Sequence, residues 1–314
     1  MKSARQSGQR SALIVVPGTV NYFYNQAGRR LAEALHANGW QTRLTTLQTL
    51  AAEPAQQSVD GVFLVNIYEL IHSHPGGETF LTGLRQRSRR LVQVLLECVT
   101  TNWFIENFRL GNRFGADWLF DFGLQDQAAQ ASVSVRAKYK FVFNGLTASE
   151  RQTLESLDEQ EPRPIPWAFV GHQTGKRVEL AYRLVRDFHP SGFFYLPELS
   201  PVTEDGPHLN EEQFLRVLQR AQYQIWSSHH QEFYLEGERF RASLLTGSVP
   251  VKVMLNAAAP TTELPFSYLL FGESELVERL HAMEFDSVRR RFVADFARLP
   301  NLAESLSEVI NKLD

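Results

Sequence analysis

The stretch "FYLEGERFRASLLTGSVPVKVML" (residues 233–255) contains a short amphipathic segment, a glycine and a run of apolar residues. Phe240 and Leu244 are spaced to lie on one helical face, and Gly247 is placed to end the helix. The apolar run from Val249 has the length and β-branched content of a buried strand. A helix that leads directly into a buried strand is typical of a parallel α/β sheet.

Arg239 is predicted to lie in the first turn of this helix. Unpaired backbone N–H groups give a helix start about half a positive charge, so a cation there costs about 0.3–1 kcal/mol unless an anion offsets it. A bound anionic ligand would do so, since a guanidinium grips phosphate oxygens with two parallel hydrogen bonds. A local ion pair with Glu232, Glu236 or Glu238 is the alternative that the sequence leaves open.

The same alternation extends through the rest of the chain. Apolar runs of strand length alternate with helical patterns from "ALIVV" (12–16) to "YKFVFNG" (139–145), and again from "WAFVG" (167–171) onward. Three prolines within "EPRPIPW" (161–167) forbid a helix and mark a junction. We therefore predict an α/β protein of two Rossmann-like domains, residues 1–160 and 161–314. The C-terminal helix is expected to pack back on the first domain.

The composition of the chain argues against some classes of function. The 314 residues are 43% hydrophobic and 21% charged, and the net charge of −3 gives no bulk attraction to nucleic acid or to an anionic membrane. The basic run "RQRSRR" (85–90) is interpreted as a solvated helix face. The single cysteine, Cys98, lies in an apolar run and indicates a reducing, cytoplasmic compartment. No apolar segment reaches the length of a membrane span, so at most peripheral membrane contact is expected.

A second loop, "VGHQTGKRVEL" (170–180), also joins a predicted strand to a predicted helix. Gly171 permits close approach of the backbone, Thr174 suits a helix cap, and the N–H groups at the helix start suit a phosphate. Only three residues separate Gly171 from Gly175, so the loop is not a Walker motif. The first βα turn lacks G-x-G-x-x-G, which argues against a dinucleotide-binding enzyme.

The segments "ERFRASLLTGSVPVKV" (238–253) and "WAFVGHQTGKRVEL" (167–180) together resemble the C-terminal domain of GT-B glycosyltransferases, particularly CgeB-like and exostosin-like proteins. Such domains carry an Arg before a "FEALxxGxxPV" pattern. The resemblance covers residues 165–256 and is only topological before that. It implies two Rossmann-like domains facing across a cleft. It also implies a metal-independent, hexosyltransferase-like enzyme whose second domain holds a nucleotide-sugar donor such as a UDP-sugar and whose first domain holds the acceptor.

One position departs from the family pattern. Ala242 stands where the family usually has a Glu that holds the ribose hydroxyl groups of the donor, and a methyl group cannot accept those hydrogen bonds. Three explanations stay open: Glu238 or Glu236 substitutes, donor binding differs, or the protein binds without turnover as a scaffold. A sugar-nucleotide enzyme of another kind, similar to a 2-epimerase, is a further alternative.

Candidate site residues follow from the two loops and the resemblance. The expected acceptor is a glycan, a protein or a small molecule, with no cofactor beyond the nucleotide-sugar co-substrate. A proton acceptor is expected among Glu69, His72, His74, Glu97 and Glu106, and we select Glu97 and His72; the pair His72 and His74 could instead bind a metal, although none is predicted. The predicted donor-binding residues are Gly171, His172, Thr174, Lys176, Arg177, Glu238 and Arg239, with Arg239 also catalytic.

Overall fold

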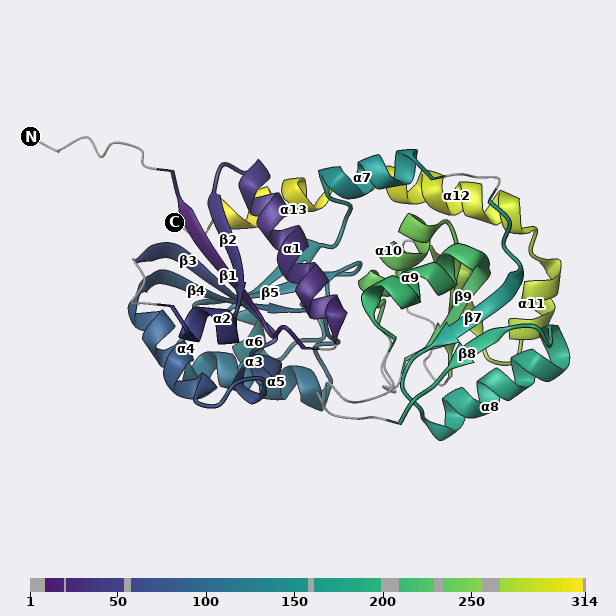
Figure 1. The fold of residues 1–314 in the computed structure, drawn as a ribbon, viewed down its shortest axis with the longest axis horizontal. Helices are drawn as coiled ribbons and strands as arrows, with labels where there is room; N and C mark the ends of the chain where they lie inside the picture. The colour runs from purple at the N-terminus through teal and green to yellow at the C-terminus, as the bar shows by residue number, and fades with distance from the viewer. Residues whose placement is uncertain are drawn as a thin grey trace, which may run out of the picture. The chain divides into compact units, whose positions relative to one another are not determined.

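The chain forms two compact units in a computed structural model. Unit 1 comprises residues 1–147 and 301–314, and unit 2 comprises residues 148–300. The structure describes residues 9–19, 21–53, 58–157, 161–198, 209–228, 234–255 and 266–312. Each unit is built on its own parallel sheet (Figure 1).

Unit 1 contains a six-stranded sheet in the order β2-β1-β3-β4-β5-β6, with every pair of neighbours parallel. The chain leaves β1 toward one edge to form β2 and then returns past β1 to form β3. The strands are β1 Ser11–Val16, β2 Gln41–Thr46, β3 Val59–Val65, β4 Ser88–Leu95, β5 Trp118–Gly123 and β6 Tyr139–Phe143.

Helices cover both faces of this sheet. Because side chains alternate across a strand, Ile14 and Val16 pack with α1 and α13, whereas Leu13 and Val15 pack on the opposite face (Figure 1). The helices are α1 Tyr22–Ala37, α2 Leu47–Ala51, α3 Ile67–His72, α4 Gly77–Gln86, α5 Asn102–Arg113, α6 Val133–Arg136 and α13 Leu302–Ile310.

Unit 2 contains a five-stranded parallel sheet in the order β11-β10-β9-β7-β8. Its first strand again has the second strand on one side and the third on the other, so both units share the doubly wound pattern of a Rossmann-like fold. The strands are β7 Ile165–Val170, β8 Phe193–Tyr195, β9 Ala221–Ser227, β10 Val249–Met254 and β11 Leu270–Gly272.

The helices of unit 2 include the two whose starts the sequence singled out, α8 after β7 and α10 before β10. They are α7 Ala148–Glu155, α8 Gly175–Arg183 with the π-turn η1 Leu184–Phe188, α9 Glu211–Arg220, α10 Gly237–Thr246, the 3-10 turn η2 Ser267–Leu269, α11 Leu276–Ala282 and α12 Phe285–Ala297. No helix within the described ranges is long and apolar enough to cross a membrane.

The prediction of two Rossmann-like α/β domains is confirmed, with local corrections. The segment after β3 that contains His72 and His74 forms α3, α4 and the turn between them. The basic run 85–90 is not a helix face throughout, because β4 begins at Ser88. The C-terminal part of the chain forms the two helices α12 and α13 with Pro300 between them, and α13 packs on α1 and β6.

Candidate functional site

The order of strands locates one special point in each sheet. In a doubly wound sheet, ligands bind outside the carboxyl ends of the strands, where successive connections turn in opposite directions. In unit 2 this switch point lies between β7 and β9, and in unit 1 it lies between β1 and β3. The loop that carries Gly171 leaves β7 at the first of these points.

The loop after β7 is held by its own backbone and by a helix cap. Thr174 accepts a hydrogen bond from the Arg177 N–H through Oγ1 at 3.3 Å, so the expected cap of α8 is present. The N–H groups of Gly171 and Gln173 donate to the carbonyl oxygens of Tyr195 and Pro197, at 3.1 and 2.7 Å. These two N–H groups therefore already have backbone hydrogen-bond partners. The N–H group of Gln173, which precedes the start of α8, is therefore not available to a phosphate.

Arg177 spans the switch point. Its side chain is buried, with 3% of the residue exposed, and it donates from Nε to the carbonyl oxygen of Ser227 at 3.1 Å and from Nη1 to that of His172 at 3.1 Å. Burial and the nearby guanidinium of Arg239 lower the pKa of Arg177 to about 10, against the opposing effect of Glu236. The hydrogen-bond partners of this buried cation are thus uncharged carbonyl groups.

Arg239 lies in the first turn of α10, as the sequence predicts. It donates from Nη1 to the carbonyl oxygen of Val170 at 2.9 Å, and its guanidinium carbon lies 5.9 Å from the centre of the Trp226 ring. A Cβ atom built on Gly171 would lie 3.2 Å from Nη1 of Arg177 and 3.6 Å from Nη2 of Arg239. Gly171 therefore marks the place where the two guanidinium groups converge at the end of β7.

A third cation, Lys252, lies near these two and was not selected from the sequence. Its ammonium group donates to Ser228 Oγ at 2.6 Å, to the Tyr234 carbonyl oxygen and to Glu236. Burial lowers the pKa of Lys252, Glu236 raises it, and Arg239 and Arg177 lower it further. The available signal was a lysine inside the apolar strand "VPVKVML", where a charge cannot remain without a buried partner.

Glu236, at the start of α10, is that partner. Burial alone would raise its pKa, but Lys252, Ser228 and Trp226 hold the pKa at about 2. The Trp226 indole N–H donates to the carboxylate at 3.1 Å. Of the three acids considered as local partners for Arg239, Glu236 is thus engaged with Lys252, and Glu232 lies outside the described residues.

Glu238 has contacts that differ from those of Glu236. Its carboxylate accepts from Arg241 Nε at 2.9 Å, and Arg241 Nη1 donates to Glu150 of α7 at 2.8 Å. These three side chains are nearly inaccessible to solvent. The triad ties α7 to α10, and Ala242 beside it is 3% exposed.

The other donor-side residues differ in exposure. His172 is half-buried and supplies its carbonyl oxygen to Arg177, whereas Lys176 lies exposed on the first turn of α8. The structure therefore brings Gly171, His172, Arg177 and Arg239 together, and leaves Lys176 on the surface and Glu238 in the triad with Arg241.

The acceptor-side candidates are divided between the switch point of unit 1 and the surface. Glu97, after β4, accepts from the Tyr24 hydroxyl at 2.9 Å, and Glu69 in α3 is buried. His72 is exposed, stacks on Tyr68 with ring centres 4.1 Å apart, and contacts the Tyr68 carbonyl oxygen through Nδ1. His74 has a buried Nδ1 without a hydrogen-bond partner among the described residues.

Neither the two histidines nor their neighbours form a metal cluster. Among the residues that the structure describes, no group of three or more His, Cys, Asp and Glu side chains is arranged to hold a metal ion. Glu106, the remaining acid of the acceptor-side set, lies exposed on α5 near Arg109.

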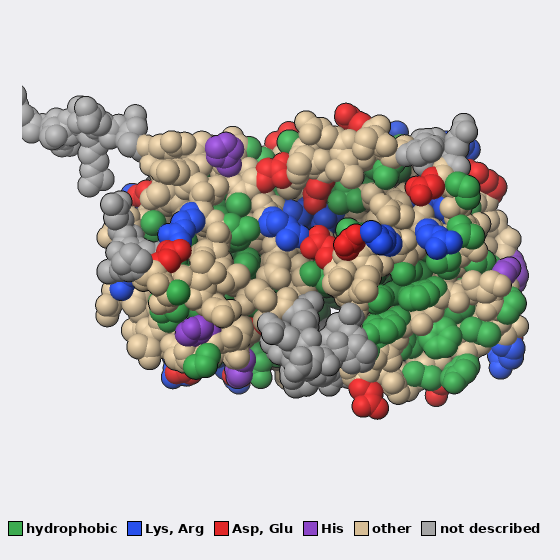
Figure 2. Space-filling model, in the orientation of Figure 1, with side chains coloured by type: hydrophobic (Ala, Val, Ile, Leu, Met, Phe, Trp, Pro, Cys, Tyr) green, Lys and Arg blue, Asp and Glu red, His purple; other side chains and the backbone are tan. Residues whose placement is uncertain are grey.

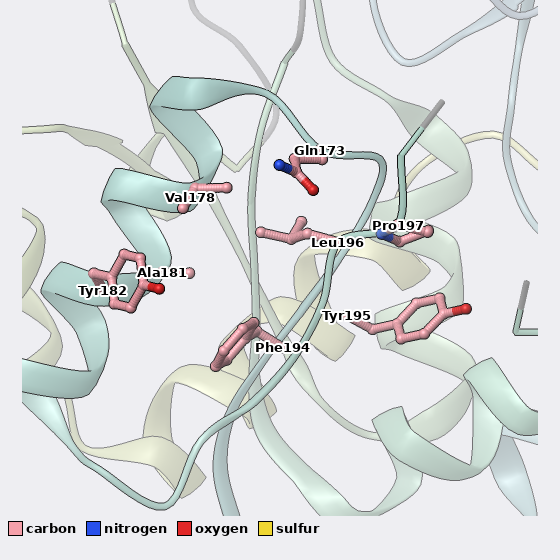
Figure 3. A pocket seen from close by; sticks show the side chains of 8 residues that line it. All are labelled: Gln173, Val178, Ala181, Tyr182, Phe194, Tyr195, Leu196 and Pro197. Carbon is pink, nitrogen blue, oxygen red and sulfur yellow. The ribbon is translucent and has the colours of Figure 1, made fainter. Parts of the chain in front are cut away.

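A pocket of about 400 Å³ lies next to the loop after β7, between α8 and the segment that begins with β8 (Figure 3). Phe194 and Leu196 point toward α8, while the ring of Tyr195 extends the other way. Tyr182 and Phe194 are 67% and 50% exposed, and hydrophobic side chains spread over this part of unit 2 (Figure 2). The pocket is lined by Gln173, Val178, Ala181, Tyr182, Phe194, Tyr195, Leu196 and Pro197.

Comparison with known proteins yields similarity in fold but not in sequence. No protein-family model matches the chain, and no curated protein matches its sequence. An alpha-glucosyltransferase in complex with UDP-glucose and DNA containing an abasic site aligns with a TM-score of 0.62 at 10% identity, covering 97% of this chain and 99% of that one.

Two further structures align over similar lengths. An alpha-glucosyltransferase in complex with UDP and a 13-mer DNA containing a central A:G mismatch gives a TM-score of 0.60 at 10% identity, covering 98% of this chain and 100% of that one. A glycosyltransferase from Rickettsia africae ESF-5 gives 0.56 at 10% identity, covering 97% and 98%. The chain therefore has the two-domain α/β fold of GT-B glycosyltransferases.

Proposed function

We propose that this protein is a glycosyltransferase that moves a sugar from a nucleotide-sugar donor, such as a UDP-hexose, to an acceptor. Arg177 carries the proposal. It is a buried cation at the switch point of unit 2, its hydrogen bonds go to carbonyl groups, and its pKa is lowered by burial and by Arg239. A diphosphate placed beside Gly171 would relieve the repulsion between the two guanidinium groups.

The chemistry of transfer requires such an arrangement. Negative charge builds up on the diphosphate as the bond to the sugar breaks, and preorganised donors aimed at that charge lower the barrier. Arg239 and Arg177 are held in place by backbone carbonyl groups, so they need little reorganisation during the reaction. Lys252 and Glu236 support them, because the ion pair fixes the start of α10, the helix that carries Arg239.

We propose that the reaction needs no metal, since fixed guanidinium groups supply the positive charge that a cation would supply. Incubation with EDTA should then leave the rate of transfer unchanged. Lys176, exposed at the start of α8, and the backbone N–H groups of Gly175 and Lys176 are further candidates for contacts with the phosphates.

The proposed proton acceptor is Glu97, which lies two residues beyond the end of β4 and is half-buried. His72 is the weaker candidate because it projects from the exposed side of α3 and stacks on Tyr68. We also propose that the protein is related to CgeB-like or exostosin-like glycosyltransferases, because the residues around Gly247 and Gly171 resemble theirs.

The second candidate function is a binding protein without turnover. Two observations favour it: Ala242 cannot accept a hydrogen bond from ribose, and Glu238, a possible substitute, is bound to Arg241. Glu236, with a side chain 23% exposed, is the better placed substitute. Release of nucleoside diphosphate in the presence of donor and acceptor would distinguish a transferase from such a protein.

Two of the similar glucosyltransferases are in complex with DNA, but we do not propose that this protein binds DNA. A net charge of −3 offers no bulk attraction to a polyanion.

Thermal unfolding in the presence of UDP-, GDP-, dTDP- and CMP-linked compounds tests the proposal. A ligand at 100 times its dissociation constant stabilises the folded state by about 2.7 kcal/mol, which is a readable shift in melting temperature. At least one compound should produce this shift, and Arg239→Ala should abolish it. Arg216→Ala is the matched control, because Arg216 is exposed on α9 and pairs with Glu212 on the same helix.

If no nucleotide in the panel shifts the melting curve, the proposed function is wrong. If Arg239→Ala keeps the full shift while remaining folded, the phosphate site has been misplaced.

A further inference from the structure

The segment after β4 that carries Glu97 is held by a side chain from the connection after β5, Gln127. Strand β4 pairs with β5 as far as Leu95, which lies opposite Asp121. Beyond this point the Gln127 amide supplies hydrogen bonds of the kind that a neighbouring strand supplies. Its Nε2 donates to the carbonyl oxygen of Glu97 at 3.3 Å, and its Oε1 accepts from the Val99 N–H at 3.1 Å. These two bonds fix the backbone from which the Glu97 side chain projects.

Gln127 is itself 2% exposed and is held from two sides. Its Nε2 also donates to Asp121 Oδ2 at 3.1 Å. Its backbone N–H donates to the Tyr139 hydroxyl oxygen at 3.0 Å, and that hydroxyl donates to the same Asp121 oxygen at 2.7 Å. Because an ionised carboxylate only accepts hydrogen bonds and the Val99 N–H only donates one, a single orientation of the amide satisfies all of its partners.

The other end of the Glu97 side chain is fixed by helix α1. The Tyr24 hydroxyl donates to Glu97 Oε1 at 2.9 Å. Burial, and after it Glu97 and Glu69, raise the pKa of Tyr24, so this hydroxyl keeps its proton and remains a donor. Glu97 is therefore held at its backbone by Gln127 and at its carboxylate by Tyr24.

We propose that Gln127 is a positioning residue for the transfer reaction, because it holds Glu97 where that carboxylate takes the proton of the acceptor hydroxyl, and that Asp121 in turn holds the Gln127 amide. This inference rests on the proposed function. In the step concerned, the acceptor oxygen bonds to the anomeric carbon and its proton passes to Glu97. The bond from that carbon to the diphosphate breaks, and its electron pair leaves with the nucleoside diphosphate. A displacement of about 1 Å can lower the rate of such a step about 100-fold.

The test measures release of nucleoside diphosphate from UDP-glucose, GDP-mannose and dTDP-glucose at pH 8, with water as the acceptor, and determines kcat and KM for the fastest donor. Gln127→Met keeps the length of the side chain and removes its hydrogen bonds. We expect kcat to fall about 10-fold or more and KM to change less than about 2-fold, since the donor-binding residues of unit 2 are untouched. Gln130→Met is the matched control, because Gln130 is exposed in the same connection, and it should change neither constant.

A second background shows whether Gln127 acts through Glu97. Glu97→Gln removes the proton acceptor and keeps the size of the side chain. If Gln127 serves to place that carboxylate, Gln127→Met should lower kcat less than about 2-fold in the Glu97→Gln protein, because effects of coupled residues are not additive. A residue that only stabilises the fold would lower kcat by the same factor in both backgrounds.

Asp121→Asn separates positioning from stability and is available if Gln127→Met does not fold. Burial raises the pKa of Asp121 to about 7, so its carboxylate is ionised at pH 8. An ionised acceptor forms a stronger hydrogen bond than an amide oxygen, so the variant should hold Gln127 less firmly and lower kcat about 3-fold at unchanged KM. The same variant removes a buried charge and should be more stable than the wild-type protein, so its lower kcat cannot come from unfolding.

The inference is overturned if Gln127→Met folds and keeps the wild-type kcat, or if its effect lies in KM alone. It is also overturned if Gln127→Met lowers kcat equally in both backgrounds, or if Asp121→Asn keeps the full kcat. A wild-type protein that releases no nucleoside diphosphate contradicts the proposed function and, with it, this inference. A wild-type protein that releases it, with variants that lose no rate, contradicts the inference alone.

Discussion

At the scale of single residues, Asp121 is a buried acid outside both switch points. It is fully buried in β5, and its Oδ2 accepts from the Tyr139 hydroxyl at 2.7 Å and from Gln127 Nε2 at 3.1 Å. Oδ1 has no partner within the described residues. Burial raises the pKa of Asp121 to about 7, and the two hydrogen bonds oppose that rise.

This pKa predicts a pH dependence of stability with a definite sign. The unfolded chain releases the proton near pH 4 and the folded chain releases it near pH 7, so the folded state binds the proton more tightly. Stability should fall as the pH rises from about 4 to 7, by as much as about 4 kcal/mol. Asp121→Asn should remove this fall and raise the free energy of unfolding at pH 8.

Urea denaturation at a series of pH values checks this prediction, with the exposed Glu106→Gln as the control variant. An unchanged pH profile in Asp121→Asn would show that the carboxylate is not the group responsible.

Only part of the candidate site could be predicted from residue identity. Arg239 and Gly171 were found because a cation at a helix start and a glycine after a strand are local signals. The partner of Arg239 could not be predicted, because Val170 is 69 positions away and contributes a carbonyl group that every residue type has. Lys252 was missed for a related reason, since its partner Glu236 lies 16 positions earlier in the chain.

At the scale of elements, periodicity identified most strands and the helices with apolar faces. Strand β5, "WLFDFG", was not recognised because Asp121 interrupts its apolar run. Helix α3 was missed because it has only six residues. Its start is fixed by the Asn66 side chain and by a left-handed backbone, neither of which appears as an apolar period.

Helix α13 supports a prediction of its own. It lies at the end of the chain, yet it buries Leu302, Leu306 and Ile310 in the core of unit 1. Each such side chain contributes about 1.5–3 kcal/mol, so their loss approaches the whole stability of a typical domain, about 5–15 kcal/mol. A chain ending at residue 300 should therefore lose the unfolding transition of unit 1 and keep that of unit 2.

Differential scanning calorimetry measures both transitions, and a chain ending at residue 312 is the control. If the shortened chain shows both transitions at their original temperatures, α13 does not stabilise unit 1.

At the scale of the whole molecule, the two units share one topology and differ in chemistry. The switch point of unit 2 carries the cations Arg177, Arg239 and Lys252, while that of unit 1 carries the acids Glu69 and Glu97. Strands and helices alternate in both halves of the sequence, and this alternation predicts the topology that the two units share. The contrast in charge depends on which loops the sheets bring together, and it was visible only in the structure.

The central claim is that the switch point of unit 2 holds a nucleoside diphosphate, and calorimetric titration of UDP and of uridine tests it most directly. The account predicts that UDP binds about 100-fold more tightly than uridine, since hydrogen bonds to charged groups contribute about 1.5–3 kcal/mol each. Gly171→Val should reduce this ratio about 10-fold or more, because the added side chain occupies the space beside Nη1 of Arg177 and Nη2 of Arg239, whereas Gly175→Val, with open space around its Cβ position, should preserve it. Equal affinities for UDP and uridine, or a ratio that survives Gly171→Val, would contradict the account.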